Sequence, residues 1–146
     1  MRKIICPDYG PPETLIVHDA PTPKPAPGQV LVRHRAWGLN YVDMLMCAGG
    51  YQLKPETPFT PGGEATGDVV ALGDGVEGIA IGDRVMTSAQ LGLFTEIAAV
   101  DPTGVIPLPT TFDYAEGAVF KSAYMTAWNA LNHGAHLRPG EVLLVH

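Results

Sequence analysis

Residues of the types that bind metal ions occur in this chain, but their spacing does not form a ligand set. The two cysteines, Cys6 and Cys47, are far apart, and nothing marks the chain for secretion, which predicts two reduced, part-buried thiols. Of the five histidines only His133 and His136 lie close together, at the end of an expected helix, where they favour helix termination. Zinc needs a clustered set of nitrogen and sulfur ligands, so we expect no bound metal.

One acidic residue, Glu64, stands in a run of small residues. Gly62, Gly63 and Gly67 beside it allow tight turns and close approach of the backbone, although each can also be a plain turn residue. This setting predicts that Glu64 is partly buried, and a buried carboxylate needs a hydrogen-bonded or charged partner such as an arginine. The pattern favours a structural role for Glu64 over a catalytic one.

The composition is that of a folded domain and disfavours several kinds of partner. Of the 146 residues, 46% are hydrophobic and 16% are charged, which is ordinary for one soluble globular domain. The net charge of −6 has the wrong sign for attraction to nucleic acid or to an anionic membrane. The sequence lacks a membrane-spanning run and a secretory signal, which predicts a cytoplasmic protein with a small-molecule partner.

Glycine and proline divide the first two thirds of the chain into short segments. The chain has 17 glycines and 14 prolines, most of them before residue 110. This pattern favours short strands joined by tight turns, and hence a β-barrel or sandwich. The expected strands are Arg2–Cys6, Thr14–His18, Gln29–Ala36 (with Leu31 on a wet face beside the arginines), Thr66–Leu72, Arg84–Thr87, Leu93–Val100 and Gly104–Ile106.

The helical signals are fewer. Tyr41–Ala48 has apolar residues at helical spacing, with Asn40 as a plausible N-cap and Gly49 as a stop. Asp113–His133 is free of proline and keeps a helical period, which fits two helices or one broken helix. After it, Glu141–His146 begins an apolar run typical of a parallel strand buried on both faces.

Five motifs in order resemble the medium-chain dehydrogenase/reductase superfamily. They are APGQVLVRHRAWGLNYVD (Ala26–Asp43), PGGEATGDVVALGDGV (Pro61–Val76), GDRV (Gly82–Val85), AVFKSAYMTAWNAL (Ala118–Leu131) and RPGEVLLVH (Arg138–His146). The resemblance spans essentially the whole chain. It implies a GroES-like β-barrel followed by the first strand of a truncated Rossmann domain.

Departures from the zinc-dependent members of this superfamily indicate the subgroup. Asn40 stands where those enzymes have a metal-binding cysteine, and Gly63 where they have a histidine. Neither residue can replace a thiolate or imidazole ligand. Met86–Phe94, where a structural-zinc lobe should follow, contains no cysteine. The chain therefore resembles the zinc-independent quinone oxidoreductases.

The resemblance also implies roles for individual residues. Without a metal, hydrogen-bond donors must polarise the substrate carbonyl, and Asn40, Tyr41 and Tyr51 are the candidates. Asn40 can instead be only an N-cap, Tyr51 a loop aromatic, and Tyr41, like Trp128, a core residue. On the cofactor side, Thr126 and Asn40 are expected near the nicotinamide, and Lys121 near a phosphate or the substrate. Thr126 can instead bond a helical carbonyl, and Lys121 can be an exposed helix lysine.

These observations predict three segments: a substrate-binding domain over 1–112, a helical connection over 113–137 and the first strand of a nucleotide-binding domain over 138–146. The expected function is the substrate-binding part of an oxidoreductase that transfers a hydride from NADPH to a quinone or enone. The parent protein is a possible homo-oligomer, and the isolated chain is expected to be inactive. The alternative is a non-catalytic GroES-like binding or structural module without a nucleotide domain.

Overall fold

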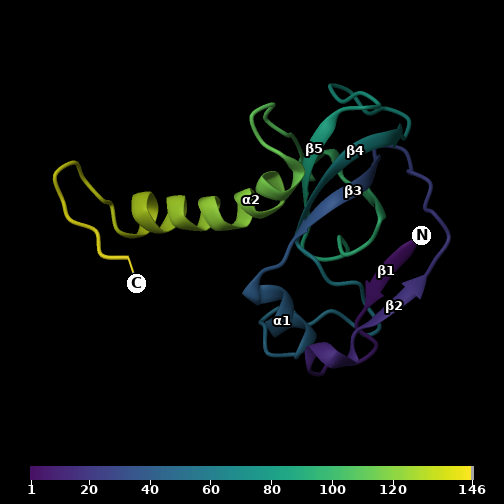
Figure 1. The fold of residues 1–146 in the computed structure, drawn as a ribbon, viewed down its shortest axis with the longest axis horizontal. Coiled ribbons are helices and arrows are strands. Elements are labelled where there is room, and N and C mark those ends of the chain that lie inside the picture. Colours follow the sequence, from purple (N-terminus) through teal and green to yellow (C-terminus); the bar gives the residue numbers. More distant parts are fainter. Residues whose placement is uncertain (146) are drawn as a thin grey trace.

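The chain folds into two antiparallel sheets with α2 extending away from them on one side, and the computed structural model describes residues 1–145 (Figure 1). The strands are β1 (Arg2–Ile5), β2 (Ile16–Asp19), β3 (Val30–Gly38), β4 (Glu64–Leu72), β5 (Arg84–Ser88), β6 (Ile97–Val100) and β7 (Val105–Pro107). The helical elements are α1 (Tyr41–Cys47), α2 (Tyr114–Trp128) and the short η1 (Pro12–Thr14), η2 (Pro102–Gly104) and η3 (Asn129–Gly134). The predicted mostly-β architecture with a few helices is confirmed.

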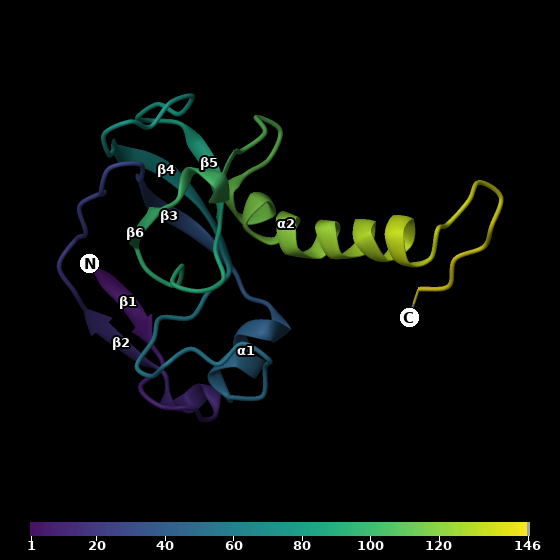
Figure 2. The ribbon, with the colours of Figure 1, turned by 180° about the vertical axis from the view of Figure 1, so that it is seen from behind.

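The larger sheet has five antiparallel strands in the order β6-β3-β4-β5-β7. Its central pair is β3 and β4, which run alongside each other from Val30 opposite Leu72 to Gly38 opposite Glu64. β6 is shorter than the predicted strand over Leu93–Val100, because the preceding residues bond to β1 instead. The sheet curves around the core, as both views of the ribbon show (Figures 1 and 2).

A core of small and branched apolar side chains fills the curve of this sheet. Val30 and Val32 of β3 are fully buried within it. Leu31 is buried too, contrary to the prediction of a wet face, because β3 is an inner strand that places Leu31 between Ala71 of β4 and Ala99 of β6. The cluster consists of Val30, Val32, Ala65, Val69, Val85, Leu93, Ala98 and Val100.

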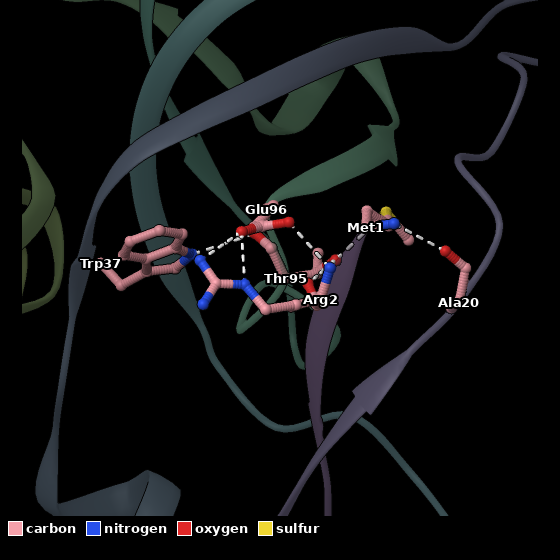
Figure 3. Close-up of polar contacts among 6 residues, drawn as sticks. All are labelled: Met1, Arg2, Ala20, Trp37, Thr95 and Glu96. Carbon is pink, nitrogen blue, oxygen red and sulfur yellow. Dashed lines mark hydrogen bonds and ion pairs between the residues drawn. The ribbon is translucent and has the colours of Figure 1, made fainter.

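The small sheet of β1 and β2 is attached to the segment that precedes β6. The Arg2 guanidinium forms an ion pair with Glu96, with 2.6 Å between Nη2 and Oε1 (Figure 3). In the same region the Trp37 indole donates a hydrogen bond to the Thr95 carbonyl oxygen at 3.1 Å (Figure 3). The side chains of Arg2 and Glu96 are 70% and 37% exposed, so this ion pair adds little to the stability of the fold.

Helix α1 begins at Tyr41 as the sequence predicts and ends at Cys47, one residue earlier than predicted. Asn40 has the extended backbone of an N-cap, and the Asp43 carboxylate accepts a hydrogen bond from the Asn40 backbone N–H at 2.8 Å. Gly49, with φ at +70°, follows the helix in the left-handed conformation that glycine adopts readily. Cys47, the last residue of α1, and Cys6 are buried as separate thiols, and burial raises the pKa of Cys47 to about 11.

Helix α2 is fixed to the barrel by its first turns. Gly117 and Ala118 are its buried residues, and the Thr66 hydroxyl of β4 donates a hydrogen bond to the Tyr114 carbonyl oxygen at 2.6 Å. Further along, the helix extends away from the sheet (Figure 2). Trp128 is therefore 65% exposed, and its interpretation as a core residue is wrong. The helix continues into η3, a π-helical stretch, rather than breaking.

The predicted strand near the end of the chain is not formed. Residues 138–145 contain no strand, and Val142 and Val145 are 97% and 79% exposed. His146 lies outside the described residues. A strand requires a neighbour to satisfy its backbone N–H and C=O groups, and no strand among residues 1–145 pairs with this segment.

The buried side chain of His34 makes the stability of the barrel depend on pH. Its Nδ1 lies 2.8 Å from the Thr95 carbonyl oxygen and its Nε2 lies 3.2 Å from the Thr87 hydroxyl. Burial lowers the pKa of His34 from its usual 6.5. His34 is therefore protonated more readily in the unfolded chain than in the folded chain. As a result, the free energy of unfolding decreases as the pH falls below 6.5.

We expect urea denaturation to show a loss of at most about 1 kcal/mol between pH 6.5 and 5.5 from this group. In His34→Gln this pH dependence should be reduced by that amount. In His18→Gln, which alters an exposed histidine, it should stay unchanged. An equal slope in wild type and His34→Gln would show that His34 does not resist protonation.

Candidate active site

An open cavity of about 620 Å³ lies between α1, the loop that follows it, the end of β5 and α2. Its volume suits a small organic molecule. Four residues predicted for the site line it, namely Asn40, Tyr51, Lys121 and Thr126. The fold thus brings together side chains from the N-cap of α1, the following loop and α2.

The fifth predicted site residue, Tyr41, is not among the residues that line this cavity. Its side chain is 72% exposed, so its alternative interpretation as a core residue is wrong as well. Tyr41 is the first residue of α1, and consecutive helical residues are turned about 100° from one another. Val42 and Asp43 line the cavity instead.

The Asn40 side chain is held by Glu64. Its Nδ2 donates a hydrogen bond to Glu64 Oε1 at 2.8 Å. The other carboxylate oxygen, Oε2, accepts a hydrogen bond from the backbone N–H of Ser122 in α2 at 2.9 Å. Glu64 is 2% exposed, which is deeper burial than the partial burial predicted, and its partners are hydrogen-bonded groups rather than an arginine. An amide and a helix N–H satisfy the carboxylate, because β4 begins directly beside both groups.

Asp43 is a site residue that the sequence interpretation missed. Its carboxylate is 4% exposed and fixes the backbone of Asn40 through the 2.8 Å hydrogen bond. Burial raises the pKa of Asp43, and the N–H groups of Asn40, Gly62 and Gly63 oppose that shift. Its position three residues after an N-cap is the signal that could have identified it.

On the α2 wall of the cavity, the Lys121 ammonium donates a hydrogen bond to the Ser88 hydroxyl at the end of β5. Lys121 takes part in neither of the ion pairs found within residues 1–145. Its positive charge is therefore available to an anionic group in the cavity. Thr126 lies on the same wall, five residues further along α2.

The glycines beside Glu64 are not equivalent. Gly62 has φ at +104°, and a Cβ there would lie 2.5 Å from the Phe94 backbone nitrogen. Gly63 lines the cavity, and a Cβ there would meet its nearest neighbour, the Ala89 carbonyl oxygen, at an ordinary 3.6 Å. Close backbone approach is thus required at Gly62 but not at Gly63.

Residues 1–145 contain no group of three or more histidine, cysteine, aspartate or glutamate side chains placed to hold a metal ion. Within the same residues, no helix has the length and apolar character needed to cross a membrane.

A curved antiparallel barrel with α1 and α2 beside one open cavity defines a GroES-like domain. The family described as alcohol dehydrogenase GroES-like domain matches residues 26–110, which is more than half of the chain. The chain belongs to this family, and its resemblance to the medium-chain dehydrogenase/reductase superfamily is confirmed.

Individual relatives agree with this assignment. A quinone oxidoreductase of Rattus norvegicus is 39% identical over 148 residues, which cover 100% of this chain and 45% of the relative. Among solved structures, the human synaptic vesicle membrane protein VAT-1 homolog-like protein has a TM-score of 0.91 and 34% identity, covering 96% of this chain and 45% of that one. The Escherichia coli quinone oxidoreductase complexed with NADPH has a TM-score of 0.85 and 27% identity, covering 90% and 40%. The chain therefore spans less than half the length of these proteins.

Proposed function

We propose that this chain is the substrate-binding part of a zinc-independent oxidoreductase that transfers a hydride from NADPH to a quinone or another conjugated carbonyl compound. The observation that carries the proposal is the single cavity lined by Asn40, Tyr51, Lys121 and Thr126. In this proposal residues 1–112 form the substrate domain, residues 113–137 connect it to a cofactor domain, and residues 138–146 begin that domain.

Asn40 and Tyr51 are the proposed donors to the substrate oxygen. Reduction of a quinone or enone places negative charge on that oxygen, and fixed hydrogen-bond donors stabilise the charge as it develops. The Asn40 amide has two N–H groups, of which Glu64 accepts one, so the second can serve the substrate. Tyr51 also lines the cavity, and its hydroxyl is the second donor in this proposal.

Lys121 and Thr126 are the proposed cofactor contacts within this chain. The Lys121 ammonium has no carboxylate partner among residues 1–145, and the Thr126 hydroxyl lies on the same helix. Together they fit a nicotinamide dinucleotide, which carries phosphates and a carboxamide. When bound, NADPH supplies the hydride. One structural neighbour is described as a complex with NADPH, which supports this choice of cofactor.

Zinc independence is supported by the residues at two positions. Asn40 and Gly63 stand where the zinc-dependent members of the superfamily have a cysteine and a histidine ligand. Both line the cavity, and the Asn40 amide is already bound to Glu64. An amide nitrogen and a glycine provide no ligands for catalytic zinc.

We expect Lys121→Ala, in the longer protein that contains this chain, to raise the KM for NADPH at least about tenfold. A charge-assisted hydrogen bond to a phosphate contributes roughly 1.5–3 kcal/mol, and kcat should change less than KM. The measurement is steady-state oxidation of NADPH at saturating quinone. Lys24→Ala, which removes an exposed lysine between β2 and β3, is the control and should leave KM unchanged.

The function itself is tested by assaying that longer protein with NADPH and either 1,4-benzoquinone or an α,β-unsaturated ketone, with and without a metal chelator. Turnover that the chelator does not reduce is the expected result. A protein that binds these compounds but oxidises no NADPH would instead be a non-catalytic binding module.

A further inference from the structure

The Glu64 carboxylate connects the substrate wall of the cavity to the cofactor wall. It is almost fully buried, yet it takes part in neither ion pair within residues 1–145. Each oxygen accepts one hydrogen bond from a different part of the fold. Asn40, the residue just before α1, donates to Oε1 through Nδ2, and the Ser122 N–H of α2 donates to Oε2. One rigid group thus touches both the proposed substrate donor and the helix that carries the proposed cofactor contacts.

The space around this carboxylate leaves it little freedom. A Cβ added to Gly38 of β3 would lie 2.6 Å from both Cγ and Oε1 of Glu64, and 2.2 Å from the Ala118 carbonyl oxygen. The Glu64 side chain therefore lies in close contact with β3, and α2 crosses at the same point. A carboxylate confined in this way keeps a fixed direction towards Asn40.

The hydrogen-bonding properties of Glu64 and Asn40 determine which end of the Asn40 amide the carboxylate binds. Both carboxylate oxygens of Glu64 accept hydrogen bonds, Oε2 from the Ser122 N–H and Oε1 from Asn40 Nδ2, so Glu64 binds the NH₂ end of the amide. The Asn40 backbone is fixed separately by Asp43. The rotation of the amide about its last bond is then set by Glu64.

We infer that Glu64 is a positioning residue, which fixes the Asn40 amide so that one N–H is bound and the other is available to the substrate oxygen in the cavity. The inference rests on the proposed function, in which Asn40 is that donor. It goes beyond the structural role expected for Glu64 from the sequence.

Glu64→Gln is the appropriate variant, because it keeps the shape and changes the hydrogen bonding. A glutamine has one oxygen and one NH₂ group, so it cannot accept from both Asn40 and Ser122. If its oxygen accepts from Ser122, its NH₂ group faces Asn40, and the Asn40 amide turns its oxygen towards it. In the longer protein we expect kcat for quinone reduction to fall about tenfold, with KM for NADPH unchanged.

A double-mutant cycle separates positioning from a general structural effect. Glu64→Gln, Asn40→Ala and the double variant are compared with wild type in the quinone assay. The double variant should be no slower than Asn40→Ala alone, because Glu64 acts only through Asn40. Glu96→Gln makes the same chemical change in the exposed ion pair of Figure 3 and should leave kcat unchanged. Losses that multiply in the double variant, or a Glu64→Gln variant with wild-type kcat, would overturn the inference.

A measurement without turnover separates this inference from the proposed function. In NMR spectra of the chain described here, the side-chain NH₂ resonances of Asn40 should shift in Glu64→Gln and stay in place in Glu96→Gln. Unchanged resonances in Glu64→Gln would overturn the inference, whatever the kinetics show. Shifted resonances, together with an Asn40→Ala variant of full activity, would instead contradict the role of Asn40 in the proposed function and leave the contact with Glu64 intact.

Discussion

Gly67→Ala is expected to lower the free energy of unfolding by about 3 kcal/mol, the upper end of the usual cost of overpacking a core. Gly67 lies in β4 opposite His34 of β3. A Cβ at this position would lie 2.1 Å from the Arg33 carbonyl oxygen and 2.7 Å from the Arg33 carbonyl carbon. These are backbone atoms of the neighbouring strand, so the clash is relieved only if the central strand pair of the sheet separates.

Gly63→Ala is the matched control for this prediction. It makes the same change four residues earlier, where the added Cβ meets only the Ala89 carbonyl oxygen at 3.6 Å. We expect its free energy of unfolding to stay within about 0.5 kcal/mol of wild type. Both variants are measured by urea denaturation of the 146-residue chain. Similar stabilities for the two would mean that β3 and β4 are not packed as closely as described.

The strands could be predicted because the signals that set them are local. Turn residues and short apolar runs place β3, β4 and β5 close to their predicted ranges. Burial is harder to predict, because it depends on how elements that are distant in the sequence pack together. Leu31 is buried by its position between β4 and β6, and Trp128 is exposed because α2 leaves the sheet. The spacing of residues along one strand or helix predicts neither the burial of Leu31 nor the exposure of Trp128.

At the candidate site, the sequence does not predict which residues that are distant in the chain form hydrogen bonds with one another. The sequence indicates that Glu64 is partly buried and needs a hydrogen-bonded or charged partner, such as an arginine, but it does not identify that partner. Its actual partners are the Asn40 amide and the Ser122 N–H, 24 and 58 residues away in the chain. The curvature of the barrel brings these three groups together. A prediction from single motifs therefore finds Asn40 and Glu64 separately and misses their contact.

The C-terminal segment shows why an apolar run alone does not define a strand. Val142–Val145 has the composition of a buried parallel strand, yet residues 138–145 form none. Parallel pairing needs a neighbouring strand to supply backbone partners and apolar cover. Within residues 1–145 the strands pair only with antiparallel partners in the two sheets.

Asn40→Ala is expected to lower kcat for quinone reduction about 100-fold in the longer protein, because loss of one donor to a developing oxyanion typically reduces the rate by that factor. KM should change less, since the donor matters most when charge has accumulated on the substrate oxygen. Gln29→Ala removes an amide side chain just before β3, whose oxygen accepts a hydrogen bond from the Ala26 N–H, and should leave kcat unchanged.

Stability must be measured alongside activity, because Asn40→Ala also removes a hydrogen bond from a buried carboxylate, at a cost of about 1–3 kcal/mol. The variant should therefore unfold at lower urea concentration, yet stay folded under assay conditions by circular dichroism. At saturating substrate a folded fraction above one half cannot account for more than a twofold loss of kcat. A folded Asn40→Ala variant that retains more than about a third of the wild-type kcat would contradict the assignment of Asn40 as the donor to the substrate oxygen.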